Sequence, residues 1–125
     1  MPIEGDDALL VRQFRAATGG LILEVPAGKR DVPGEPPATT AARELEEEVG
    51  RRAGHLELLC EFFNTPGFCD EYTYLFLATD LTPIDHPPIE EAEIEVVPWP
   101  LSDLGGLIER IEDAKSLIGL LRLAR

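Results

Sequence analysis

The residues best suited to chemistry are the carboxylates of an acidic segment, 43–50, which reads RELEEEVG. In a helix, at about 100° per residue, Glu44 and Glu48 lie one turn apart and Glu47 neighbours both. Like charges at this spacing destabilise a helix, and close carboxylates raise one another's pKa. A bound divalent cation removes both costs, so the spacing indicates a metal site. A merely solvated acidic face is the alternative that the segment alone leaves open.

Arg43 belongs to the same constellation, because it precedes Glu47 by four positions and its guanidinium can pair with that carboxylate. Such a pair orients a carboxylate that ligates a metal. We therefore assign Glu47 and Arg43 to the catalytic machinery, with Arg43 in a supporting role.

These carboxylates need a helix and a sheet to position them. Apolar and β-branched runs predict strands at 8–14, 21–25, 55–63, 71–79 and 94–99. Helical periodicity predicts helices at 38–49, 104–111 and 114–123. Proline-rich loops are expected at 26–37 and 80–88. The order predicts one domain over residues 1–125, an α/β or α+β fold with a mixed sheet sandwiched between helices.

The first predicted helix presents an apolar stripe toward the core. The stripe consists of Ala38, Ala41, Ala42, Leu45 and Val49. We expect Thr39 or Thr40 to cap its start and Gly50 to end it.

The composition excludes some partners. The 125 residues carry 24 acidic and 11 basic side chains, a net charge of −13, which argues against a nucleic-acid surface. A phosphate-bearing small molecule remains compatible if a cation stands between the two negative partners. No basic start or membrane-length apolar run occurs, so we expect a cytoplasmic protein without membrane contact. The two cysteines, Cys60 and Cys69, are expected to be reduced.

The acidic segment, taken with Glu35, resembles the Nudix box. That pattern is Gly, five residues, Glu, seven residues, then Arg-Glu-U-x-Glu-Glu-x-Gly-U, with U a bulky aliphatic residue. Seven residues separate Glu35 from the RELEEEVG segment, and Leu45 fills the first U position. The box departs from the pattern twice. The pattern expects its first glycine at position 29, which is Lys29, and the glycine stands one residue earlier as Gly28. The last U position holds Arg51 in place of an aliphatic residue.

Resemblance to the ADP-ribose pyrophosphatase branch of that family covers about Leu9 to Leu121. The segment 24–28 (EVPAG) is similar to a branch motif, as are the turn at 66–71 (PGFCDE) and the closing helix at 113–117 (DAKSL). The resemblance implies the Nudix fold, a mixed sheet between helices. It also implies hydrolysis of ADP-ribose to AMP and ribose 5-phosphate. Another nucleoside diphosphate sugar is the alternative substrate, and a module that senses a nucleotide without cleaving it is the alternative class.

The resemblance also implies a ligand set for Mg²⁺, with Mn²⁺ equally suited to carboxylates. Glu44 and Glu48 would be direct ligands, Glu47 would ligate or assist, and the backbone carbonyl of Ala27 would add a further oxygen. Glu35 and Arg43 would hold the box together.

The branch often takes its general base from an acidic loop between later strands. Here we choose Glu90 first and keep Glu91 or Glu93 in reserve. A solvated loop is the alternative, because sequence cannot show whether a base reaches the water.

Three residues are expected to contact substrate. Arg15 corresponds to a family arginine that binds phosphate or the terminal ribose, and Lys29, with Arg30 beside it, could meet phosphates. Phe68 is the better candidate to stack a base, since Trp99 suits core packing. Solvent-exposed roles for Arg15 and Lys29 remain the alternatives.

Branch members usually carry a small N-terminal sheet that helps dimerise and stacks the adenine. This chain starts almost at the catalytic domain, so we expect a shortened chain or a compact variant. A homodimer is left open, and Leu9 and Leu10 are expected to be exposed residues that offer it another face.

Overall fold

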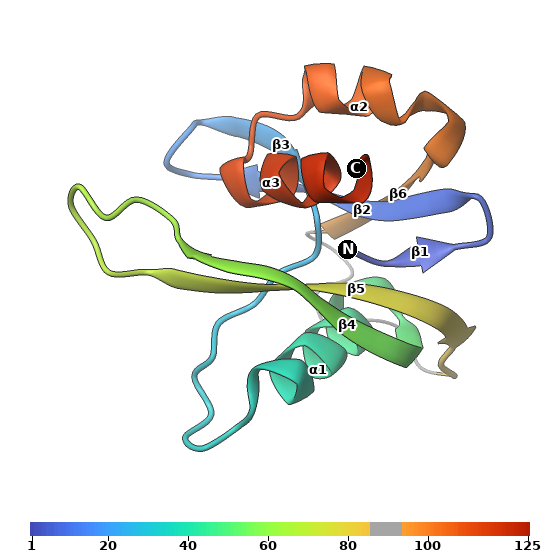
Figure 1. Cartoon of the computed structure of the whole chain (residues 1–125), viewed down its shortest axis with the longest axis horizontal. Coiled ribbons are helices and arrows are strands. Elements are labelled where there is room, and N and C mark those ends of the chain that lie inside the picture. The colour runs from blue at the N-terminus through green and yellow to red at the C-terminus, as the bar shows by residue number, and fades with distance from the viewer. Residues whose placement is uncertain (86–93) are drawn as a thin grey trace.

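The structure is a computed structural model, and it describes residues 1–85 and 94–125. Elements follow the predicted order of strands, helix, strands and helices (Figure 1). The strands are β1 (Ile3–Glu4), β2 (Asp7–Arg15), β3 (Gly20–Glu24), β4 (Arg51–Phe63), β5 (Tyr72–Pro83) and β6 (Ile94–Pro100). The helices are α1 (Pro37–Val49), α2 (Leu104–Arg110) and α3 (Ala114–Leu123), with a 3-10 turn, η1, at Leu101–Asp103. None of the helices in the described ranges is long and apolar enough to cross a membrane.

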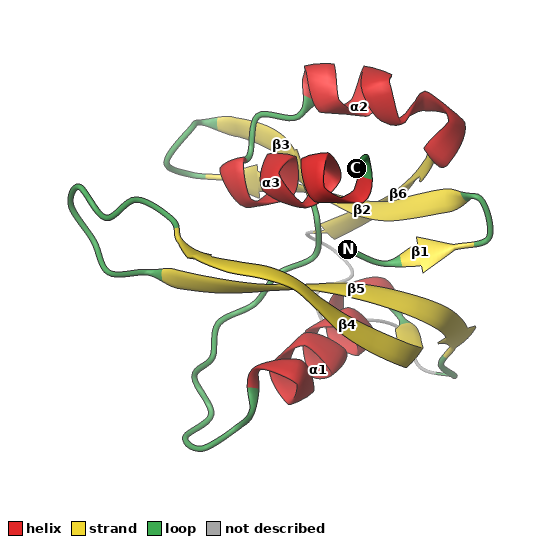
Figure 2. Cartoon of the chain, in the orientation of Figure 1, coloured by secondary structure: helices red, strands yellow, loops and turns green. Residues whose placement is uncertain are grey.

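Two β-sheets form the middle of the molecule. In the first, β2 pairs antiparallel with β1, β3 and β6. In the second, β4 and β5 form a long antiparallel hairpin. A parallel bridge between Pro2 and Ala78 joins the sheets. Helix α1 covers one side of this layer, and α2 and α3 cover the other (Figure 2). The predicted fold class, strands sandwiched between helices, is confirmed.

At the open end of the β4–β5 hairpin, away from its turn, both strands are longer than predicted. The strand expected at 55–63 begins at Arg51, and the loop expected from Asp80 begins only after Pro83. These extensions pair with each other, Arg51 with Pro83 and Arg52 with Thr82. Their partners are distant in sequence and their residues are largely polar, so local hydrophobic periodicity does not reveal them.

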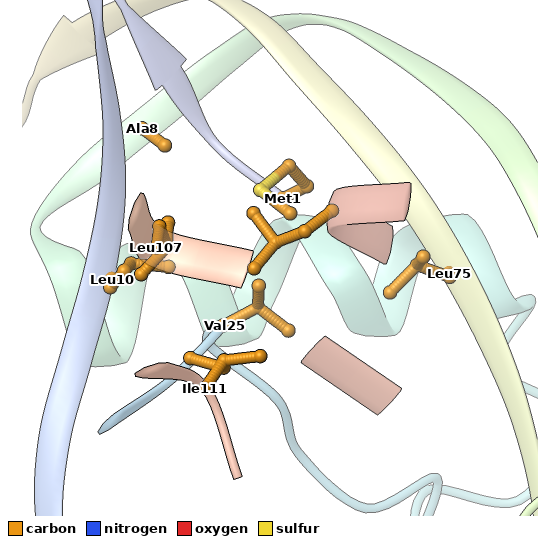
Figure 3. Packing of buried hydrophobic residues seen from close by; sticks show 8 residues of the cluster. Met1, Ala8, Leu10, Val25, Leu75, Leu107 and Ile111 are labelled. Carbon is orange, nitrogen blue, oxygen red and sulfur yellow. The ribbon is translucent and has the colours of Figure 1, made fainter. Parts of the chain in front are cut away.

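Strand β2 supplies both hydrophobic cores, because alternate side chains point to opposite faces. Ala8 and Leu10 pack with Leu107 of α2 and Leu120 of α3 in one cluster (Figure 3). Leu9 lies in the other cluster, against α1. Burying each leucine contributes about 2 kcal/mol.

The expectation that Leu9 and Leu10 are exposed is therefore wrong. Their exposed fractions are 3% and 0%. The all-apolar run of β2 reflects burial on both faces. Neither leucine offers a face for a dimer.

The start of α1 also differs from the prediction. Pro36 is the N-cap and forms no side-chain cap bond. Pro37 occupies the first turn, where the absence of a backbone N–H in proline costs no helical hydrogen bond. Thr40 is buried, and its hydroxyl donates to the Glu35 carboxylate at 2.6 Å. Ala38, predicted to face the core, is exposed.

The end of α1 is as predicted. Gly50 adopts φ 70°, a left-handed conformation that favours glycine, and its N–H donates to the Glu46 carbonyl at 3.1 Å. Arg51, the residue that departs from the box, begins β4 and pairs with Glu4 of β1 at 2.6 Å. An ion pair thus takes the place of the expected aliphatic contact.

Candidate functional site

A cavity of about 840 Å³ lies among α1, β5 and the loop that follows β3. Small-molecule sites are commonly of this size. The predicted site residues along its lining are Arg15, Ala27, Lys29, Glu44 and Glu48. The structure therefore brings carboxylates of the predicted acidic helix into one cavity with the cationic residues that are expected to contact substrate.

The backbone of the loop after β3 packs directly on the carboxylates of α1. The Ala27 N–H donates to Glu48 Oε2 at 3.1 Å, and Glu48 is buried at 7% exposure. At Gly28, a Cβ atom would fall only 1.9 Å from Glu44 Cδ. Glycine is required there because any side chain would displace the Glu44 carboxylate. Pro26 stops β3 just before this approach.

Arg43 organises the outer side of the acidic helix. Its guanidinium donates to Glu35 Oε1 at 3.1 Å, to Glu44 Oε1 at 3.1 Å and to Glu47 Oε1 at 3.4 Å. The expected Arg43–Glu47 contact is present. Hydrogen bonds from Arg43 and then from Thr40 hold the pKa of the Glu35 carboxyl below its usual value. Arg43 thus fixes the carboxylates at both ends of the box relative to one another.

Arg15 is held by a buried partner that was not singled out in the sequence. Its Nε and Nη2 donate to the two oxygens of Glu24 at 2.8 Å and 3.0 Å. Lys115 Nζ, from α3, donates to the same carboxylate at 2.8 Å. Burial alone would raise the pKa of Glu24, but Arg15 and Lys115 outweigh burial and lower it. Arg15 and Lys115 both line the cavity.

The N-terminus of α3 connects this group to the sheet. Asp113 caps the helix by accepting from the Ser116 N–H at 3.1 Å, and it also accepts from Lys115 Nζ at 2.9 Å. Ser116 Oγ in turn accepts from the Val25 N–H at 2.9 Å. The closing helix is therefore locked to the loop that carries Ala27 and Gly28.

The β4–β5 hairpin adds a polar and aromatic wall that sequence reasoning missed. The lining residues it contributes near its turn are Asn64, Glu71, Tyr72, Thr73 and Tyr74. Tyr72 and Tyr74 alternate along β5, so a strand following the box with two tyrosines on one face was the available signal. Phe68, predicted to stack a base, lies in the turn itself at 84% exposure and outside the cavity lining.

Several other predictions can be placed. Glu47 lies beside Arg43 and not among the residues that line the cavity. Trp99 packs against the core, as expected, and its Nε1 donates to the Asp103 carbonyl at 3.1 Å. Cys60 and Cys69 are free thiols, as expected. The acidic loop residues Glu90, Glu91 and Glu93 lie outside the described residues.

The donor set along the cavity is oxygen-rich. Glu44 and Glu48 provide carboxylates next to the Ala27–Gly28 backbone, and oxygen donors suit hard divalent cations. Within residues 1–85 and 94–125, no three His, Cys, Asp or Glu side chains are grouped closely enough to enclose a metal by themselves.

Comparison with known proteins places this arrangement in a family. Residues 1–118 match the NUDIX domain model. The chain is 39% identical over 110 residues to an ADP-ribose pyrophosphatase of Mycobacterium tuberculosis, covering 86% of this chain and 53% of that protein. It is 41% identical over 112 residues to an ADP-ribose pyrophosphatase of Bacillus subtilis, covering 86% and 60%. The chain thus spans little more than half of the length of these curated relatives.

The fold gives the same assignment. A crystal structure of an ADP compounds hydrolase superposes with a TM-score of 0.89 at 30% identity, covering 98% of this chain and 67% of that one. The resemblance first seen in the acidic segment is therefore confirmed, and the chain belongs to the Nudix family.

Proposed function

We propose that the chain hydrolyses a nucleoside diphosphate derivative, with ADP-ribose cleaved to AMP and ribose 5-phosphate as the main reaction. The observation that carries this proposal is one shared cavity. It holds Glu44 and Glu48 against the Ala27–Gly28 backbone, and it holds the cations Arg15 and Lys115. Relatives named ADP-ribose pyrophosphatase at 39% and 41% identity support the substrate.

The residues present fit a Mg²⁺ site. Mg²⁺ retains several waters and binds through one or two carboxylates together with substrate phosphates, so Glu44, Glu48 and the Ala27 carbonyl are a sufficient protein contribution. Glycine at position 28 keeps the Glu44 carboxylate in place. Mn²⁺ suits the same oxygens. When bound, the metal neutralises phosphate charge and lowers the pKa of a coordinated water.

The side chains divide the remaining work. Glu44 and Glu48, with Glu47 assisting, would hold the cation, and Arg43 with Glu35 orients these carboxylates. Arg15, Lys29 and Lys115 attract and orient the diphosphate, because each lines the cavity. Glu24 keeps Arg15 and Lys115 in place.

We propose Glu90 as the residue that accepts the proton of the attacking water, with Glu91 or Glu93 in reserve. Single Gln variants at Glu90, Glu91 and Glu93 test this assignment. If all three variants retain full turnover, the base lies elsewhere.

A substrate panel tests the function. The protein is incubated with Mg²⁺ and ADP-ribose, sugar nucleotides or dinucleoside diphosphates, and the released phosphomonoester is measured. We expect ADP-ribose to give the highest kcat/KM, and EDTA to abolish turnover until Mg²⁺ is restored. An equal or higher kcat/KM for a sugar nucleotide would show that ADP-ribose is not the main substrate. Tight binding without any turnover would instead indicate a nucleotide sensor.

A further inference from the structure

The cavity lining includes aromatic rings as well as the carboxylates of α1. Tyr72 and Tyr74 of β5 line it, with ring centroids 5.3 Å apart and planes at 73°. The guanidinium carbon of Arg30 lies 5.2 Å from the centroid of the Tyr74 ring. Arg30 also lines the cavity, and it is exposed to solvent. A guanidinium lying over an aromatic ring is thus presented to whatever enters.

This stack is supported from outside the cavity. Arg30 Nη2 donates to the Glu35 carbonyl at 2.9 Å. The Glu35 side chain is fixed by Arg43 and Thr40 of α1. Tyr72 donates its hydroxyl to Glu61 Oε1 at 3.0 Å and packs edge-on against Phe63 at 4.8 Å. The tyrosine and arginine planes are therefore held by neighbours on both the loop and the hairpin.

We propose that Arg30, Tyr74 and Tyr72 form a nucleobase subsite, in which the base of the substrate stacks while its diphosphate lies toward Glu44 and Glu48. This inference rests on the proposed function. It adds a binding site for the base of the substrate, which the metal site does not contact. Phosphates gain nothing from aromatic rings, and the cavity already offers Arg15, Lys29 and Lys115 to them. A heterocyclic base gains from stacking on both a phenol ring and a guanidinium plane.

Replacing Arg30 by lysine separates the two roles. Arg30→Lys retains the positive charge that a phosphate would use but removes the planar group that a base would use. Tyr74→Leu removes the ring, and Tyr74→Phe retains it. Phe14→Leu is the matched control, because Phe14 is 61% exposed on β2 and does not line the cavity.

The measurement is the Kd of AMP and of ribose 5-phosphate by titration calorimetry in Mg²⁺. We expect the wild-type protein to bind AMP more tightly than ribose 5-phosphate. Arg30→Lys and Tyr74→Leu should each raise the Kd of AMP about tenfold, the scale of one stacked base, and leave that of ribose 5-phosphate unchanged. Tyr74→Phe and Phe14→Leu should retain both values.

Three results overturn the subsite. A rise of equal size for AMP and ribose 5-phosphate would make Arg30 a phosphate ligand, and no rise for either variant would remove the platform from recognition. If Tyr74→Leu fails to fold, the exposed Arg30→Lys variant still decides. Because binding of products is measured, a protein that cleaves nothing but reads AMP through this stack refutes the proposed function alone. Hydrolysis of ADP-ribose with a KM that both variants leave unchanged refutes the subsite alone.

Discussion

Two groups of charged residues contribute side chains to the cavity lining, and their charges are balanced differently. On α1, the single guanidinium of Arg43 is shared among Glu35, Glu44 and Glu47. Between β3 and α3, the single carboxylate of Glu24 is shared between Arg15 and Lys115. The first group carries an excess of negative charge. In the second, Glu24 and Asp113 together offset the charges of Arg15 and Lys115. Both groups contribute to the same cavity lining.

This difference assigns the two groups different work. An excess of carboxylates on a helix destabilises it unless the charge is compensated, which a bound divalent cation would do. A buried carboxylate that is satisfied by two cations instead fixes their positions and lends structural stability. Changes in the first group should therefore mainly alter activity, while loss of Glu24 from the second should also lower folding stability.

The largest effect is expected at Glu48. Glu48→Gln should lower kcat by at least about 100-fold, equal to roughly 2.7 kcal/mol of transition-state stabilisation, because an amide is a poor ligand for a hard cation. The assay measures phosphomonoester release from ADP-ribose at saturating Mg²⁺. Glu46→Gln is the control, since Glu46 lies on the same helix but pairs with Arg52 outside the cavity. Near-normal activity of Glu48→Gln would remove α1 from the metal site.

The second group should respond in stability. Glu24→Gln should lower the free energy of unfolding by about 2 kcal/mol, because Glu24 is only 2% exposed and two cations lose their charged partner. Urea denaturation at neutral pH measures it. The comparison variant is Glu95→Gln, which breaks the exposed Arg12–Glu95 pair and should change stability by less than about 1 kcal/mol. Equal losses from the two variants would mean that burial of Glu24 contributes nothing.

A backbone contact links α1 to the loop that carries Ala27. Gly28→Ala should lower kcat/KM about tenfold and raise the Mg²⁺ concentration needed for half-maximal activity, because the new methyl group pushes Glu44 aside. Thermal unfolding should show little change. Gly67→Ala is the control, because a Cβ there meets no atom within 4 Å. Normal Mg²⁺ dependence in Gly28→Ala would show that Glu44 can move without consequence.

The acidic group could be predicted because its spacing within one helix is a local property. Glu44, Glu47 and Glu48 are brought together by helical geometry alone, and Gly50 marks the end of that helix. The fold class followed from the same kind of local periodicity. Even so, the sequence did not show that Gly28 must lie against Glu44, since that contact depends on the path of a proline-rich loop.

The cationic group could not be assembled from sequence, because its members lie far apart. Glu24 and Lys115 are 91 residues apart, and only the packing of α3 against the end of β3 joins them. The tyrosine wall has a similar origin. Tyr74 contacts Arg30 because the β4–β5 hairpin lies against the loop after β3. The residue predicted to stack a base was instead Phe68, which is exposed in the hairpin turn. Leu9 and Leu10 were misread because exposure of a strand depends on what covers its second face.

The smallest effect sharpens the comparison through pH. Burial alone would raise the pKa of Asp113, but hydrogen bonds from Ser116 and Lys115 outweigh it and hold the pKa below its usual value. A carboxyl with a depressed pKa in the folded state stabilises the protein above its unfolded pKa, and this contribution is lost as the pH falls through the folded value. Asp113→Ala should therefore lower the free energy of unfolding by about 1 kcal/mol between about pH 7 and pH 5, the usual effect of losing a helix cap.

Below about pH 4 the wild-type protein should lose this advantage, so that its stability and that of Asp113→Ala converge. Urea midpoints measured for both proteins at each pH test the convergence. Asp103→Ala serves as the control, because Asp103 precedes α2 without forming a side-chain cap bond. A difference between wild type and Asp113→Ala that persists unchanged into strong acid would mean that Asp113 stabilises α3 by packing and not by its charge. Glu24 would then be the carboxylate whose charge holds Arg15 and Lys115 in place.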